Sequence, residues 1–143
     1  MKDYIILTDS TSDLCKELRT EYNIEYVAMN ITYDNKEYIA SLDWEDYSAK
    51  ELYDLMRDGK RIRTTQVPYN IYLRKFIQCA EQNLDILYIS CSSALSGTVN
   101  VARSVKEEVS EKYPNIKINI VDSLISSLGQ ASIVIKAAKL KQE

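Results

Sequence analysis

Apolar and polar positions follow two different periods along this chain, and together they predict strands separated by helices. Short apolar or alternating runs are typical of strands at residues 4–8, 27–32, 37–39, 84–89 and 116–121. Longer stretches with apolar positions three or four residues apart predict helices from the polar cluster 9–13 to about residue 22, and at 48–58, 69–80, 97–113 and 126–140. This order predicts an α/β fold with a mostly parallel sheet flanked by helices and one small β-hairpin insertion.

Local signals set several element boundaries. Ser48 and Glu51 have the spacing of a capping box, in which each side chain satisfies a free backbone donor of the other residue. Gly59 predicts the end of that helix. Asp34 and Asn35 predict the turn of the hairpin.

The strand at 84–89 is nearly continuously apolar, as expected for a strand that is covered on both faces of a parallel sheet. We therefore expect the strands near 4–8, 84–90 and 116–121 to be parallel neighbours. Their carboxyl ends then lie at one edge of the sheet.

Composition and charge exclude several classes of protein. The 143 residues carry a net charge of -3, which gives no reason to expect a nucleic-acid partner. No apolar run approaches the ~20 residues of a membrane span, and the N-terminus lacks a signal-peptide core, so we expect a cytoplasmic protein. Cys15, Cys79 and Cys91 have no metal-ligand spacing, and we expect buried, reduced thiols.

The chain contains no histidine, which excludes Ser-His-Asp and Cys-His catalysis and histidine-ligated zinc. With three glycines it has no dinucleotide or phosphate-loop motif, and we expect no cofactor. Asp9 and Asp122 could hold Mg²⁺, but two carboxylates without phosphate-loop spacing do not establish a metal site.

Five clusters of polar residues, most of them rich in hydroxyls, lie where a ligand could bind. Three of them directly follow a predicted strand, and the other two precede a predicted helix. Ligands of open α/β sheets bind beyond the carboxyl ends of the strands, where helix starts attract anions. These clusters therefore predict an anion site at that edge. The alternative is that the hydroxyls only cap helices. The clusters are Asp9-Ser10, Ser92-Ser93, Asp122-Ser123, Thr64-Thr65-Gln66 and Ser96-Gly97-Thr98.

Four segments resemble the signatures of the DegV family and occur in the family's order along the whole chain. They are residues 6–14 (Ile-Leu-Thr-Asp-Ser-Thr-Ser-Asp-Leu), 64–66 (Thr-Thr-Gln), 92–98 (Ser-Ser-Ala-Leu-Ser-Gly-Thr) and 121–123 with Gly129. The chain departs from the family signatures at two positions. Ala94 stands where the family usually has a glycine, and Pro68 lies one position later than the proline of the family's T-S-Q-P. Family chains are about twice as long, so we expect residues 1–143 to form a single DegV-like N-terminal domain without the second family domain.

The resemblance implies a non-enzymatic lipid carrier that binds a long-chain fatty acid and presents its carboxylate to a fatty acid kinase subunit. It implies carboxylate ligands at Thr64, or the neighbouring Thr65, and at Ser93. Ser96 and Gly97 would add helix-start amides. The expected supporting residues are Asp9, Ser10, Gln66, Ser92, Asp122 and Ser123. Without the second domain we expect an exposed apolar patch, which a homodimer could cover.

Two other functions stay open at this point. One is an acyl or phosphoryl transferase with Ser93 as nucleophile, although no base lies next to Ser93 in the sequence. The other is a truncated domain that keeps only an interaction role.

Overall fold

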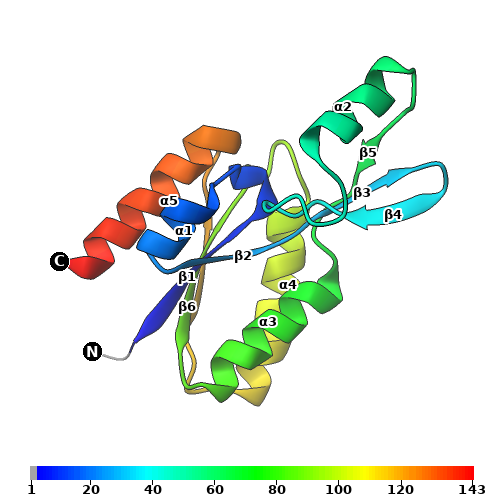
Figure 1. The fold of residues 1–143 in the computed structure, drawn as a ribbon. Helices are drawn as coiled ribbons and strands as arrows, with labels where there is room; N and C mark the ends of the chain where they lie inside the picture. The colour runs from blue at the N-terminus through cyan, green and yellow to red at the C-terminus, as the bar shows by residue number, and fades with distance from the viewer. Residues whose placement is uncertain (1–2) are drawn as a thin grey trace.

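The computed structural model describes residues 3–143, and a four-stranded parallel sheet lies at its centre (Figure 1). The strand order is β2-β1-β6-β7, and every neighbouring pair is parallel. The prediction that three strands share one carboxyl edge is therefore confirmed. The bounds are β1 Tyr4–Asp9, β2 Ile24–Val27, β6 Asp85–Ser90 and β7 Ile118–Asp122.

Helices cover both faces of this sheet, as the periodicity predicts (Figure 1). Helices α3 (Tyr69–Glu81) and α4 (Thr98–Lys112) pack on one face, and α1 (Lys16–Glu21) and α5 (Ser127–Gln142) on the other. Alternate residues of β1 point to opposite faces of the sheet. Ile5 and Leu7 are buried in the core beneath α3 and α4, and Ile6 is buried in the core beneath α1 and α5. Burying a side chain of this size contributes about 1.5–3 kcal/mol, so both cores stabilise the sheet.

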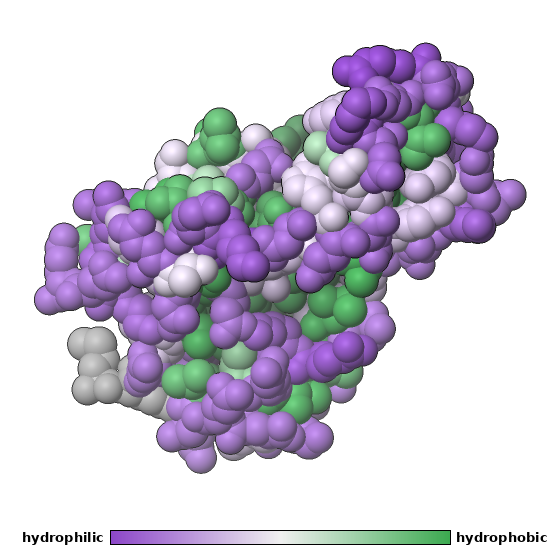
Figure 2. Space-filling view, in the orientation of Figure 1, coloured by the Kyte–Doolittle hydropathy of each residue, from purple (hydrophilic) through white to green (hydrophobic). Residues whose placement is uncertain are grey.

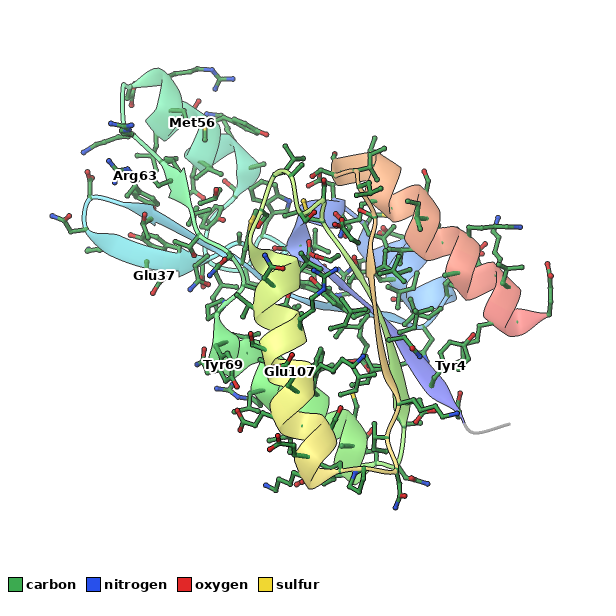
Figure 3. All side chains as sticks on the ribbon, turned by 180° about the vertical axis from the view of Figure 1, so that it is seen from behind. Tyr4, Glu37, Met56, Arg63, Tyr69 and Glu107 are labelled. Atoms are coloured by element: carbon green, nitrogen blue, oxygen red, sulfur yellow. The ribbon has the colours of Figure 1, made fainter. Side chains whose placement is uncertain are left out.

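A second, three-stranded antiparallel sheet and one helix extend to one side of the main sheet (Figures 1 and 3). We call residues 30–64 the lobe. Figure 3 shows Glu37, Met56 and Arg63 there, far from Tyr4 at the start of β1. The sheet order is β4-β3-β5. The bounds are β3 Asn30–Tyr33, β4 Lys36–Ile39, α2 Ala49–Arg57 and β5 Arg63–Thr64.

The local signals in the lobe are confirmed. Ser48 and Glu51 form the capping box at the start of α2. Asp34 and Asn35 adopt φ angles of 49° and 59°, as the tightest hairpin turns require. Gly59 follows α2 with a φ of 83°, which a glycine adopts without strain.

Three predicted elements are wrong in detail. Residues 27–32 are not one strand, because Ala28 and Met29 carry the chain from β2 in the main sheet to β3 in the lobe. The polar cluster 9–13 forms a short 3₁₀ helix, η1 (Ser10–Ser12), that ends at Asp13, whose φ of 52° separates it from α1. Residues 63–64 pair with β3, so the hairpin has a third strand.

The surface differs from expectation at one cysteine. Cys79 and Cys91 are buried, but Cys15 is exposed because it precedes α1 at the surface. Within residues 3–143, no helix combines the length and the apolar character that a membrane crossing requires. Apolar side chains are exposed near the start of α5 (Figure 2). Leu124 and Leu128 are 77% and 69% exposed, and Leu95, in the loop before α4, is 71% exposed.

Candidate functional site

Asp9 lies at the end of β1 and is completely buried. The Tyr88 hydroxyl donates to its Oδ2 atom at 2.7 Å, and the Cys91 backbone N–H donates to the same atom at 3.1 Å. The Thr11 backbone N–H donates to Oδ1 at 3.1 Å. Asp9 therefore binds the groups around it and links the ends of β1 and β6.

Two tyrosines and a glutamine extend this network into the core. The Tyr72 and Tyr88 hydroxyl oxygens are 2.5 Å apart, and burial raises the pKa of both side chains well above the usual value. Both hydroxyls therefore stay protonated and can donate. Gln130 Nε2 donates to Thr8 Oγ1 at 3.0 Å and to Asp9 Oδ1 at 3.3 Å, which attaches α5 to the same point. The network supports the sheet edge beneath the site.

The other strand-end hydroxyls also bind backbone atoms. Ser10 Oγ accepts from the Met29 N–H at 3.1 Å, and Ser92 Oγ accepts from the Ala94 N–H at 3.2 Å. Ser123 Oγ donates to a backbone carbonyl at 2.9 Å. These three contacts are to loop backbone and not to the start of a helix, whereas Asp9 caps the short helix η1. They shape the loops around the site.

A pocket of about 420 Å³ opens where the segment before α3 meets the loop before α4. We call it the polar pocket. It brings together the predicted site residues Thr64, Thr65, Gln66, Ser96 and Gly97. A Cβ at Gly97 would lie 2.5 Å from Gln66 Oε1, so the glycine permits this close approach. The remaining lining residues are Thr11, Met29, Cys91, Leu95 and Ser126.

None of the described residues that line the polar pocket is charged, so dipoles alone would have to attract an anion there. Helix α4 begins here with Gly97 at its N-cap and no side-chain cap, and a helix start carries about half a positive charge. Ser96 Oγ accepts from the Thr98 N–H at 3.2 Å and donates to Thr98 Oγ1 at 3.0 Å, which orders this first turn. A hydroxyl-rich pocket at a helix start is suited to a carboxylate.

Two threonines of the pocket differ in their hydrogen bonding. Thr65 donates to the Asn30 carbonyl through its backbone N–H at 2.8 Å and its hydroxyl at 3.4 Å. Among residues 3–143, no side chain or backbone group is hydrogen-bonded to the Thr64 hydroxyl. Thr64 is therefore the better placed of the two to bind a ligand.

Ser93 is not one of the residues that line the polar pocket. Its backbone N–H donates to Asp122 Oδ1 at 3.1 Å. Hydrogen bonds from the Ser93 hydroxyl, and then from the Leu124 backbone, lower the pKa of Asp122. The carboxylate-binding role of Ser93 stays a prediction.

Asp9 and Asp122 bind different groups. Asp9 is enclosed by Tyr88 and Cys91, whereas Asp122 holds the loop at Ser93. The pair does not form a shared Mg²⁺ site in this geometry.

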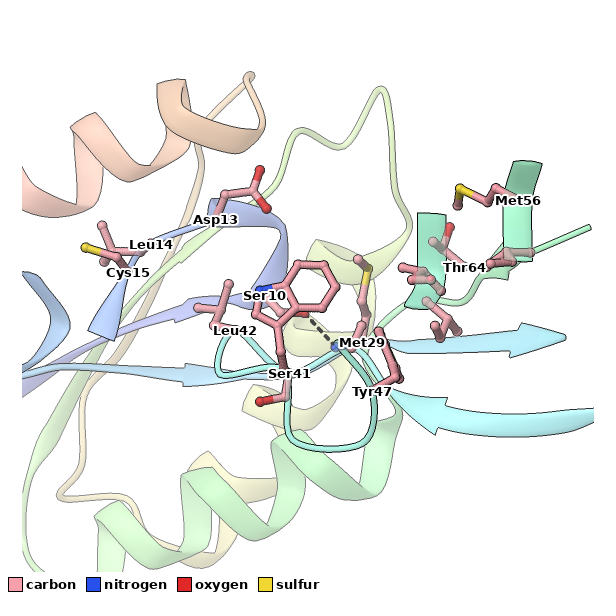
Figure 4. A pocket seen from close by; sticks show the side chains of 15 residues that line it. Ser10, Asp13, Leu14, Cys15, Met29, Ser41, Leu42, Tyr47, Met56 and Thr64 are labelled. Carbon is pink, nitrogen blue, oxygen red and sulfur yellow. Dashed lines mark hydrogen bonds between the residues drawn. The ribbon is translucent and has the colours of Figure 1, made fainter. Parts of the chain in front are cut away.

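A second pocket, of about 390 Å³, lies between the lobe and the segment after β1 (Figure 4). We call it the apolar pocket. Figure 4 shows Met29, Tyr47 and Met56 around it, contributed by the lobe and the segment that leads into it. Met29 and Thr64 line both pockets, so the two adjoin. Its lining residues are Ser10, Asp13, Leu14, Cys15, Met29, Ile31, Ala40, Ser41, Leu42, Trp44, Tyr47, Leu52, Met56, Ile62 and Thr64.

Sequence reasoning missed the apolar pocket. One signal was present, because Leu52 and Met56 are four residues apart and therefore share a face of α2. Which surface that face covers depends on where the lobe lies relative to β1, and periodicity carries no such information.

Comparison with known proteins decides the family. Residues 4–143 match the DegV family model. The chain belongs to the DegV family. A DegV domain-containing protein of Clostridium perfringens is 38% identical over 143 residues, which are 100% of this chain and 49% of the relative. A DegV domain-containing 15.5 kDa protein of Staphylococcus aureus is 33% identical over 129 residues, 90% of this chain and 86% of that relative.

Solved structures share this fold. A stearic acid-binding protein from Eubacterium ventriosum superimposes with a TM-score of 0.90 at 25% identity, over 97% of this chain and 47% of that one. A fatty-acid-binding DegV family protein from Thermus thermophilus gives a TM-score of 0.85 at 27% identity, over 99% of this chain and 48% of that one. The chain thus spans about half the length of these structures and of the Clostridium perfringens relative.

Proposed function

We propose that this domain binds a long-chain fatty acid, with the carboxylate in the polar pocket and the acyl chain in the apolar pocket. The observation that carries the proposal is that two pockets of opposite chemistry meet at Met29 and Thr64. A molecule with a small anionic head and an apolar chain matches this pair. The stearic acid-binding relative from Eubacterium ventriosum supports the same ligand class.

The Thr64 hydroxyl is the proposed main ligand of the carboxylate. Gln66 and the start of α4 at Gly97 would add favourable dipoles, whereas Ser96 would donate only after its hydroxyl leaves Thr98 Oγ1. A hydrogen bond to a charged group contributes about 1.5–3 kcal/mol, so the head group alone gives modest affinity. The Ser93 hydroxyl would join this set only after its own hydrogen bond to Asp122 is broken.

The acyl chain would provide most of the affinity, because each buried CH₂ contributes about 0.8 kcal/mol. At about 390 Å³, the apolar pocket falls within the ~300–1,000 Å³ range of small-molecule sites. Any part of the acyl chain that extends beyond the apolar pocket would need to be covered by other protein. A second domain like that of the longer relatives, or a second copy of this protein, could provide that cover. The exposed leucines near the start of α5 are the proposed contact surface.

Presentation of the carboxylate to a fatty acid kinase subunit is the proposed use of the bound acid. The exposure of Thr64, Thr65 and Gln66 supports it, since a head group bound there stays near the surface. The domain itself would act as a carrier and would carry out no catalysis.

Isothermal titration with oleate tests the binding site through two neighbouring threonines. Thr64→Val should weaken binding about tenfold, or ~1.4 kcal/mol, because it removes one donor to a charged group. Thr65→Val is the matched control and should have a smaller effect, since its hydroxyl already binds the Asn30 carbonyl. Absence of oleate binding by the wild-type chain up to the solubility limit of the acid would contradict the proposal.

A further inference from the structure

We infer that Trp44 covers the acyl chain in the apolar pocket and thereby makes the site favour long acids over short ones. The inference rests on the proposed function and adds a residue that determines specificity. Trp44 lies in the loop between β4 and α2. It lines the apolar pocket but not the polar pocket.

The indole of Trp44 lies between the apolar pocket and solvent. Trp44 is 44% exposed although it lines a pocket, so one part of the side chain contacts the cavity and another contacts solvent. Its ring meets the Tyr47 ring edge-on, with centroids 5.8 Å apart and planes at 84°. Tyr47 also lines the pocket, and it packs edge-on against Tyr38 at 6.2 Å. These aromatic contacts orient the indole beside the pocket.

The backbone of Trp44 has an unfavourable conformation that the protein core does not explain. Its φ of 55° lies in the left-handed region, which a bulky side chain rarely adopts. A strained residue persists only where the surrounding structure holds it, and such residues cluster at ligand sites. The indole is not buried in either core. Contact with a ligand would therefore explain why a tryptophan stands here.

The two residues that flank Trp44 in the loop are held in place by hydrogen bonds and an ion pair. Ser41 Oγ accepts from the Asp43 N–H at 3.1 Å and donates to Glu45 Oε2 at 3.2 Å. Asp43 also forms an ion pair with Arg19 of α1 at 2.5 Å. These contacts fix residues 43 and 45, so Trp44 can keep its conformation when its ring contacts a ligand.

Chain-length selectivity follows from this placement. A short acid fills only the polar pocket and does not reach the indole. A long acid extends past Met29 and Thr64 into the apolar pocket, where its acyl chain contacts the indole. A contact of roughly 60 Å² of apolar area is enough to change affinity about tenfold.

Fluorescence tests the contact directly, because Trp44 is the only tryptophan in the chain. Stearate should shift the emission to shorter wavelength as water is excluded from the ring. A brominated stearic acid should quench it, since bromine quenches indole at short range. Butyrate should do neither. Binding of brominated stearate, measured by calorimetry, without quenching would overturn the inference.

Trp44→Asn separates binding from stability, because asparagine adopts the left-handed conformation more easily than tryptophan. We expect a melting temperature equal to or above that of the wild type. Stearate should bind about tenfold more weakly, and butyrate within about twofold of the wild type, since only the long chain reaches the ring. Trp44→Phe should recover part of the loss for stearate.

The matched control is Tyr53→Asn, which removes an exposed lobe aromatic that does not line the pocket, and stearate binding should not change. If Thr64→Val weakens stearate binding and Trp44→Asn does not, the role of Trp44 is wrong and the proposed function stands. If the wild type binds no stearate, both are wrong.

Discussion

The main sheet and the lobe bury their side chains to very different extents. In the main sheet and its helices, Tyr72, Phe76 and Tyr88 are completely buried. In the lobe, Ile31, Ser41 and Leu52 are the buried residues, whereas Trp44 and Met56 are each 44% exposed. The main sheet is therefore stable through its own core. The lobe keeps apolar area that a ligand or a partner can bury.

The largest expected effect is the loss of a core aromatic side chain. Phe76→Ala should lower the free energy of unfolding by about 3–5 kcal/mol, because it leaves a cavity between α3 and the sheet. Met56→Ala in the lobe should cost much less, since that side chain is partly in water. Urea unfolding followed by circular dichroism gives both values. Similar values for the two variants would show that the lobe is as well packed as the sheet.

A smaller effect is expected from one buried hydroxyl. Tyr88→Phe should lower the free energy of unfolding by about 1–3 kcal/mol, because it leaves the buried Asp9 carboxylate one donor short and Tyr72 without its partner. Tyr69→Phe is the matched control, since that hydroxyl binds Glu108 at the surface. Thermal melts of both variants measure the difference. A stable Tyr88→Phe protein would show that the network beneath the site is dispensable.

Hydrogen exchange compares the two regions without any substitution. Amides of β3, β4 and β5 should exchange faster than those of β1 and β6, because local stability follows buried contacts. Stearate should slow exchange in the lobe and leave the main sheet unchanged. Equal protection of both regions before stearate is added would contradict the comparison.

The smallest expected effect concerns Ser93. Ser93→Ala should weaken oleate binding by about threefold, less than Thr64→Val, because the Ser93 hydroxyl must first leave Asp122 and so contributes less than a full hydrogen bond. Calorimetry with both variants checks the order. A larger effect of Ser93→Ala would show that the loop rearranges on binding and that Ser93 is a principal ligand.

Much of the main sheet could be predicted from the sequence, because the central strands β1 and β6 are buried on both faces and their apolar runs are local signals. The division between β2 and β3 could not. Glu25 interrupts the apolar pattern of β2, and the change of sheet at Ala28 and Met29 depends on tertiary contacts. The capping box at Ser48 and the turn at Asp34 were predictable because each depends on neighbouring residues.

The candidate site was predictable in part for the same reason. Strand ends and helix starts identified the segments at 64–66 and 96–97, which the fold brings together. Whether a hydroxyl points into the pocket depends on non-local partners, such as Asp122 for the Ser93 hydroxyl and Asn30 for the Thr65 hydroxyl. The apolar pocket depends on where the lobe lies, which no short segment encodes.

The most direct test of the central claim is a stearate titration followed by amide chemical shifts of the 16.5 kDa chain. If one acid occupies both pockets, amides of residues 64–66 and 96–98 should shift together with those of residues 42–56, at the same stearate concentration. The amides of α3 and the central part of β6 should not move. Shifts confined to the exposed face of α5, or to only one of the two pockets, would contradict the account.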